Sequence, residues 1–267
     1  MKVFKDVAIA GRTIWISIGV PSGNHKKVRA MKRNVTREQV QKNNDRLAVR
    51  NLTLLLNNNF DETCCHFTLT YKSAPNPEEA ARDRENFLRR MKRKVPGLKY
   101  VAVTEYKNVR IHHHIVMSTA DVELVNKVWD KGFVMPTVLD DTGDYTDLAE
   151  YLVKETNKTF RTKDGIHKHR WAASRNLKKP KLKRTEAAVR DLEDDPRPIK
   201  GYYIPENRVR RYEHPITGLE YIEYLMVAID KPRRYPAWPR GKEISGREHF
   251  KVNEEDEQEE LFALLGM

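Results

Sequence analysis

Cysteine is almost missing from this chain of 267 residues, which contains only the adjacent pair Cys64 and Cys65. Neighbouring residues on a strand point to opposite faces of a sheet, so this pair predicts no ordinary structural disulfide and no cysteine zinc site. We therefore expect both thiols to be packing residues of a protein that stays in a reducing, intracellular compartment.

Long hydrophobic runs are missing as well. No apolar stretch approaches the roughly 18 residues that a membrane-spanning helix needs, and the N-terminal segment MKVFKDVAIAGR lacks the apolar centre of a signal peptide. The sequence therefore predicts a cytoplasmic protein with no membrane partner. A hydrophobic fraction of 39% is still enough for a packed core, in one large domain or in one domain with additions.

Acidic residues are outnumbered, since 50 Lys and Arg against 38 Asp and Glu give a formal net charge of +12. Part of such an excess serves solubility, but this sign is typical of proteins with a polyanionic partner, most often nucleic acid. The densest basic segment, 161–184, has two interpretations: a solvated charge run, or a groove in which bases stack and phosphates are neutralised. For the second interpretation the DNA-binding residues are Arg170, Trp171, Arg175, Lys178 and Lys179.

The order of secondary-structure patterns predicts the fold class. The patterns are strand, helix, two strands, helix, strand and helix, over residues 64–71, 76–95, 99–106, 109–118, 121–130, 133–139 and 144–156. Asn76 and Pro77 are typical of a helix start. The order predicts an α+β fold with helices packed on an antiparallel β-sheet.

Further patterns flank this core. Residues 6–20 suit one or two strands, and residues 199–229 carry more strand-like segments. Residues 36–59 predict a helix, because Thr36 and Gln39 form a capping-box pattern ahead of an apolar stripe.

The strand predicted at 109–118 contains three consecutive histidines. His112 and His114 project from one face of such a strand, about 7 Å apart, and His113 projects from the other. Two imidazoles on one face can bind one divalent ion. The alternative is a histidine cluster that is only solvated on a basic surface.

Glu105 ends the strand that precedes the histidines. The short polar link Lys107–Asn108 suits a hairpin turn, which would bring Glu105 alongside His112 and His114. Two neutral imidazoles and one carboxylate, with positions left for water and substrate, predict a site for Mg²⁺ or Mn²⁺.

Tyr151 is a candidate nucleophile. Tyr151 and Lys154 are three residues apart in the last predicted helix, so they share a face. The hydroxyl, with a pKa near 10 in water, is a poor nucleophile at neutral pH, but a metal on the phosphate and a nearby ammonium would ease its attack. Alternatively, Tyr151 is a packing residue of an amphipathic helix. Tyr145 is a rival nucleophile, although no lysine follows it three residues later.

Three stretches together resemble the ordered motifs of HUH endonucleases, specifically rolling-circle replication initiators of phage and plasmid type. FTLTY at 67–71 is similar to the first motif, IHHHIVMS at 111–118 to the second, and YLVKE at 151–155 to the third, the tyrosine–x–x–lysine motif. The segment ASRNLKKPK at 173–181 also resembles a feature of such initiators. The second motif departs from the family because its middle residue is His113 rather than a bulky apolar one, so His113 is a ligand if the strand is bulged.

The resemblance implies an RRM-like split βαβ core and a specific reaction. His112, His114 and Glu105 would hold Mg²⁺ or Mn²⁺ against a scissile phosphate. Tyr151 would attack it and form a 5′-phosphotyrosine link, which leaves a free 3′-hydroxyl as a primer, while Lys154 would stabilise charge at the tyrosine oxygen.

The resemblance also implies partners. The substrate would be single-stranded or hairpin origin DNA in a bacterial host. The chain has no P-loop pattern GxxxxGK[ST], so unwinding and synthesis would need a host helicase and polymerase. The expected regions are an N-terminal support region, an endonuclease domain, a basic accessory region and an acidic tail, at 1–62, 63–180, 181–252 and 253–267.

The acidic tail has two interpretations. Gln258, Leu261 and Phe262 are similar to the bacterial sliding-clamp-binding pentapeptide, although Glu259 stands where leucine is usual. The other interpretation is a disordered acidic tail with a hydrophobic end.

Other functions compete with the initiator. A relaxase or a single-tyrosine transposase would use the same site, but relaxases commonly place the tyrosine near the N-terminus and such transposases are usually much shorter. A third candidate is a non-catalytic basic DNA-binding protein in which the histidines and Tyr151 are structural.

Overall fold

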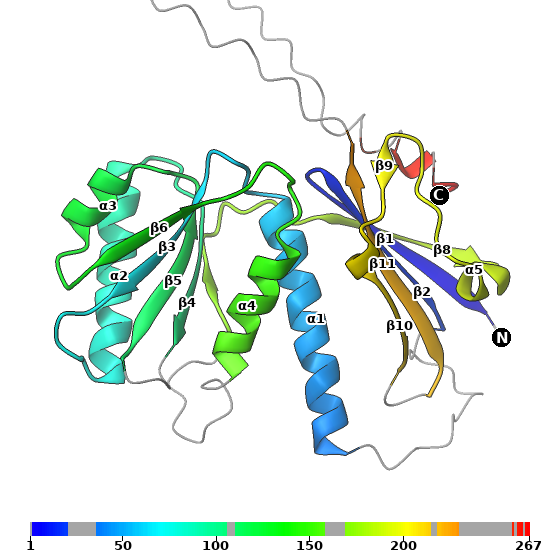
Figure 1. Cartoon of the computed structure of the whole chain (residues 1–267), viewed down its shortest axis with the longest axis horizontal. Coiled ribbons are helices and arrows are strands. Elements are labelled where there is room, and N and C mark those ends of the chain that lie inside the picture. Colours follow the sequence, from blue (N-terminus) through cyan, green and yellow to red (C-terminus); the bar gives the residue numbers. More distant parts are fainter. Residues whose placement is uncertain are drawn as a thin grey trace, which may run out of the picture.

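Two antiparallel sheets stand side by side with helices α1 and α4 between them (Figure 1). The computed structural model describes residues 2–20, 36–105, 110–157, 169–214, 218–229, 258, 261–263 and 265–267. The α+β class, with helices packed on antiparallel strands, is confirmed. The structure also contains a second sheet that the sequence did not predict.

The five-stranded sheet has the strand order β6 (Val134–Val138), β3 (Cys65–Thr70), β5 (His112–Met117), β4 (Tyr100–Glu105) and β7 (Ala172–Ala173). Helices α2 (Pro77–Lys94) and α3 (Val122–Val128) cover one face, where Phe67 and Ile115 pack against Phe87 and Trp129. Helix α4 (Thr146–Asn157) covers the other face through Leu152 and Val153. The predicted order of strands and helices from residue 64 to residue 157 is confirmed.

Local signals begin these helices as predicted. The Asn76 side chain accepts a hydrogen bond from the Glu79 backbone N–H at 2.8 Å, and Pro77 takes the first turn of α2. Asp144 caps α4 by accepting from the Thr146 backbone N–H at 3.1 Å. The start of α4 determines which of its residues face the five-stranded sheet.

The six-stranded sheet joins both ends of the chain. Its order is β10 (Val209–Glu213), β11 (Glu220–Ala228), β2 (Thr13–Gly19), β1 (Val3–Ala10) and β8 (Lys181–Ala187), with β9 (Tyr202–Tyr203) pairing to β11. The strands expected within 6–20 and 199–229 are present. Their pairing with each other, and strand β8, were not predicted, and the four-region division of the chain stays a prediction.

Helix α1 (Arg37–Asn57) connects the two sheets, and its predicted capping box between Thr36 and Gln39 is confirmed. Asn57 at its end is buried and donates to the Thr13 hydroxyl at 2.9 Å, while its side-chain oxygen accepts from the Tyr145 backbone N–H at 2.9 Å. Gly11 has φ +56°, and a Cβ there would lie 2.0 Å from the Asn57 carbonyl oxygen. The β1–β2 turn therefore approaches α1 too closely for a larger residue.

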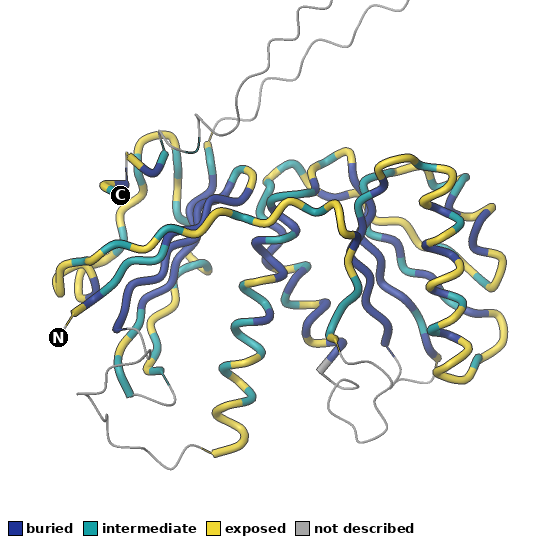
Figure 2. The backbone as a smooth tube through the Cα atoms, turned by 180° about the vertical axis from the view of Figure 1, so that it is seen from behind, coloured by how far each residue is buried: buried dark blue, intermediate teal, exposed yellow. Residues whose placement is uncertain are grey.

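The outer face of the six-stranded sheet is covered by α5 (Arg190–Glu193) and by the C-terminal segment. Phe262 is fully buried there and Lys183 Nζ lies 4.2 Å from the centre of its ring. Figure 2 shows that buried residues run through both sheets, whereas the first turns of α1 are exposed.

Two further expectations concern composition. Cys64 and Cys65 are buried free thiols, as predicted for packing residues, and burial raises the pKa of the Cys64 thiol to about 11. Among the helices that the structure describes, none combines the length and the apolar character that crossing a bilayer requires.

Candidate metal centre and tyrosine

The histidine strand lies at the middle of the five-stranded sheet. Strand β5 pairs with β4 so that Glu105 stands opposite His112, and it pairs with β3 so that Thr68 stands opposite His114. The predicted antiparallel pairing of β4 with β5 is confirmed, while the predicted turn at 107–108 lies outside the described residues. Since alternate residues share a face, Glu105, His112 and His114 all project on the face that α4 covers.

Glu105, His112 and His114 form a cluster that could hold a metal ion. One ligand atom from each lies within 4.8 Å of the others, and His112 Nε2 is 2.9 Å from a carboxylate oxygen of Glu105. Glu105 and His114 are buried and His112 is partly exposed. Two imidazole nitrogens and one carboxylate oxygen that converge in this way fit a divalent cation with coordination positions left over.

The electrostatics keep these imidazoles neutral. Burial, together with the neighbouring His66 and His112, lowers the pKa of His114 to about 3, against which Glu155 acts. Burial also lowers the pKa of His66 to about 4. Neutral imidazoles at pH 7 have free lone pairs, which is the state that binds a metal.

Tyr151 lies beside the cluster. Its hydroxyl is 3.2 Å from Nε2 of His114, its ring meets the His114 ring edge-on at 5.1 Å, and the residue is 42% exposed. Lys154 is exposed one turn further along α4, whereas Glu155 is buried. The arrangement brings a hydroxyl that substrate can reach next to a candidate cation site.

The rival Tyr145 lies elsewhere. It is buried, and its hydroxyl donates to the Asp140 carbonyl oxygen at 3.1 Å. Burial, followed by the nearby Asp140, raises the pKa of Tyr145. Of the two tyrosines that the sequence offered, Tyr151 is the one that contacts a histidine of the cluster.

His66 is a member of the site that the sequence analysis missed. It lies on β3, where its Nε2 is 3.2 Å from Nδ1 of His114, and the two rings stack at 5.3 Å. The Thr68 hydroxyl is 3.3 Å from the same nitrogen. If His114 binds a cation through Nε2, these contacts hold its ring in place from behind. The alternation of the strand put His66 on one face with Thr68, but only the pairing of β3 with β5 put that face beside His114.

His113 projects into the opposite core and does not join the cluster. Strand β5 pairs regularly with both neighbours over its whole length, so the bulge that would make His113 a ligand is not present. Its Nδ1 is 2.8 Å from the Thr104 hydroxyl, and its Nε2 is 2.9 Å from the Tyr71 hydroxyl. Arg84 donates to the same Thr104 hydroxyl at 2.9 Å. Thr104 can then donate to Nδ1, which leaves Nε2–H to donate to Tyr71.

Replacing His113 by leucine is expected to destabilise the fold by about 2–4 kcal/mol, because two buried hydroxyls lose a hydrogen-bond partner. Chemical denaturation measures this. Tyr71→Phe removes the same contact from the other side, so the double variant should lose less stability than the two single losses added together. Equal stability of His113→Leu and the wild type would contradict a structural role for His113.

The predicted DNA-binding residues fall into two groups. Arg170 forms an ion pair with Asp45 of α1 at 2.5 Å, and Trp171 packs partly buried against the core between α1 and α4. The exposed members are Arg175, Lys178 and Lys179. Much of the basic segment, residues 161–168, lies outside the described residues. A DNA-binding role for the five residues stays a prediction.

Comparison with known proteins gives one family. Searches of curated proteins and of solved structures give no match. Residues 64–160 match the family model of the replication-associated protein ORF2, a range that contains the five-stranded sheet up to β6, the histidine cluster and Tyr151. Over these residues the chain is similar to that replication-associated family, and the similarity supports a role as a replication initiator.

Proposed function

We propose that the protein is an HUH-type endonuclease that nicks single-stranded DNA and thereby initiates rolling-circle replication. The observation that carries the proposal is the Tyr151 hydroxyl, which lies 3.2 Å from His114 in a cluster with His112 and Glu105. A nucleophile beside a candidate cation site suits phosphoryl chemistry, and a formal net charge of +12 suits a nucleic-acid substrate.

His112, His114 and Glu105 would hold the cation. The carboxylate matches the preference of Mg²⁺ and Mn²⁺ for oxygen, and the two imidazoles favour Mn²⁺ over Mg²⁺. When bound, the cation would act as a Lewis acid on the scissile phosphate. His66 and Thr68 would keep the His114 ring oriented through Nδ1.

The strand transfer is a transesterification. Tyr151 loses its proton to solvent and its oxygen forms a bond to phosphorus, while the bond between phosphorus and the 3′ oxygen breaks. That oxygen leaves with the bonding electron pair and takes up a proton. The products are a 5′-phosphotyrosine link and a free 3′-hydroxyl. Lys154, exposed and three residues after Tyr151, would offset negative charge at the tyrosine oxygen.

The partners follow from this reaction. The substrate would be a single-stranded or hairpin origin in the bacterial cytoplasm, and a host helicase and polymerase would use the free 3′ end. A sliding-clamp contact through Gln258, Leu261 and Phe262 would require the C-terminal segment to leave the six-stranded sheet, because Phe262 is buried there. Clamp capture that does not change when residues 253–267 are removed would rule this contact out.

Metal removal tests the proposal. Protein incubated with a labelled pool of single-stranded oligonucleotides and Mn²⁺ should form a covalent adduct that survives a denaturing gel. Chelation with EDTA should abolish the adduct and added Mn²⁺ should restore it, because the phosphate loses its Lewis acid. DNA binding that is tight and salt-sensitive, with no adduct on any strand, would instead support a non-catalytic DNA-binding protein.

A further inference from the structure

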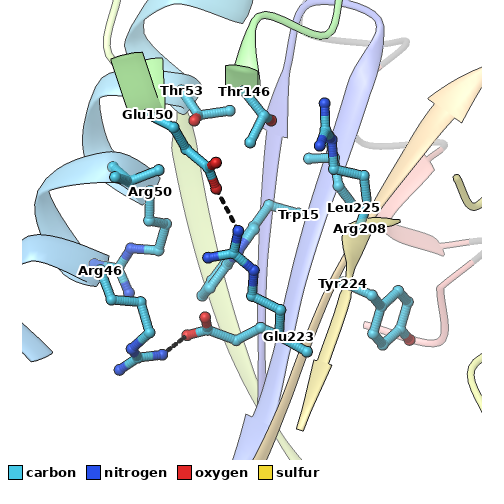
Figure 3. A pocket seen from close by; sticks show the side chains of 12 residues that line it. Trp15, Arg46, Arg50, Thr53, Thr146, Glu150, Arg208, Glu223, Tyr224 and Leu225 are labelled. Carbon is cyan, nitrogen blue, oxygen red and sulfur yellow. Dashed lines mark hydrogen bonds and ion pairs between the residues drawn. The ribbon is translucent and has the colours of Figure 1, made fainter. Parts of the chain in front are cut away.

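A second polar site lies between α1, α4 and the six-stranded sheet, on the side of α4 away from the histidine cluster (Figure 3). The pocket is lined by four arginines and two glutamates, which come from α1, α4, β10, β11 and the 3₁₀ helix η1 (Glu206–Arg208). These are Arg46, Arg50, Arg208, Arg210, Glu150 and Glu223. Positive charge therefore exceeds negative charge in its wall.

Three of the four arginines already have carboxylate partners. Arg46 pairs with Glu223 at 2.5 Å, and Arg210 pairs with Glu150. Arg208 pairs with two aspartates, at 2.7 Å and 3.0 Å. These pairs use both glutamates of the pocket wall, so neither remains as the main counter-ion of the fourth arginine.

Arg50 is that fourth arginine. Its guanidinium contacts the Asn51 side-chain oxygen at 3.0 Å and lies 4.9 Å from the ring of Trp15, but among the described residues no carboxylate lies within ion-pair distance of it. Burial lowers the pKa of Arg50. A partly buried guanidinium without a carboxylate partner is a strong donor for an anion from outside the chain.

Thr53 supplies an independent sign of a ligand. It lies one helical turn after Arg50 and lines the same pocket, where it is 5% exposed. Its hydroxyl has no hydrogen-bond partner among the described residues. Buried hydroxyls are normally bonded, so a ligand or solvent oxygen is expected beside this one.

The volume limits what fits. The pocket has about 60 Å³, and a water-sized oxygen needs roughly 10–15 Å³, so the space suits about the four oxygens of one phosphate group. We propose that this pocket binds a phosphate group, with Arg50 and Thr53 as donors to its oxygens. The phosphate belongs either to the backbone of a DNA strand that passes α4 or to free phosphate or a nucleotide.

The test is phosphate binding by the full chain, measured by calorimetry with inorganic phosphate against chloride at constant ionic strength. Arg50→Gln should weaken binding about tenfold or more, because a charge-assisted hydrogen bond is lost. Arg37→Gln, the same substitution at the exposed start of α1, should leave it unchanged. Phosphate affinity that is equal in the wild type and Arg50→Gln, or no binding to the wild type, would overturn the proposal.

Thr53→Val separates a ligand contact from a folding effect. It removes the hydroxyl at nearly constant shape, so without phosphate the melting temperature should not fall, while phosphate affinity should drop about three- to tenfold. Unchanged affinity would remove Thr53 from the site. Single-stranded DNA without a 5′ phosphate then identifies the source: displacement of inorganic phosphate indicates a backbone subsite, and its retention indicates free phosphate or a nucleotide. These readouts do not depend on strand cleavage.

Discussion

Tyr151→Phe is expected to reduce covalent adduct formation with single-stranded DNA by at least about 10³-fold, because the variant lacks the oxygen that would bond to phosphorus. The Tyr151 ring lies edge-on to His114 at 5.1 Å, and phenylalanine preserves that contact. Binding of Mn²⁺ and of DNA should therefore stay close to the wild type. Denaturing gels of the adduct, with Mn²⁺ present, measure the effect.

The matched control is Tyr145→Phe, the same substitution six residues earlier. Tyr145 is buried and donates to the Asp140 carbonyl oxygen, so its loss should lower stability by about 1 kcal/mol and leave the adduct in place. An adduct that persists in Tyr151→Phe and disappears in Tyr145→Phe would transfer the nucleophile to Tyr145. Persistence in both variants would rule out both tyrosines.

Replacing His112 and His114 together by alanine is expected to lower the affinity for Mn²⁺ by at least about 100-fold. Removing a residue that only supports a ligand already costs about 10- to 100-fold, and this variant removes two of the three groups that converge within 4.8 Å. Glu105 alone cannot hold the ion in a defined geometry. Titration followed by electron paramagnetic resonance of free Mn²⁺ measures the affinity without any reference to cleavage.

His169→Ala is the control for this pair, since His169 is exposed and lies outside the cluster. His66→Gln should have an intermediate effect, about tenfold, because it loosens His114 without removing a ligand. If the double variant binds Mn²⁺ as the wild type does, the cluster is a hydrogen-bonded group of side chains and the proposed nicking reaction loses its cation site.

The cluster of Glu105, His112 and His114 was accessible from the sequence because its members are close along the chain. Two neighbouring strands with a short link must pair, and the two-residue alternation then places all three side chains on one face. Helix starts at Thr36 and Asn76 were predictable for a similar reason, since a cap involves residues only three positions apart.

Contacts between distant segments left no such local signal. His66 reaches His114 only because β3 and β5 pair in one particular register, and a shift of one residue would turn it to the other face. The six-stranded sheet pairs β1 with β8 across most of the chain. Alternating strand patterns indicate that a segment is a strand and which residues share a face, but they do not identify its neighbour.

The phosphate pocket is the furthest from sequence reasoning. Arg50 and Thr53 belong to a helix that looked like a support element, and Arg210 and Glu223 come from strands at the other end of the chain. The sequence established a basic α+β protein with a histidine strand and a tyrosine helix, because these are properties of residues near one another. The packing of α1 and α4 between two sheets determined which arginines have partners, because charge pairing depends on distance in space.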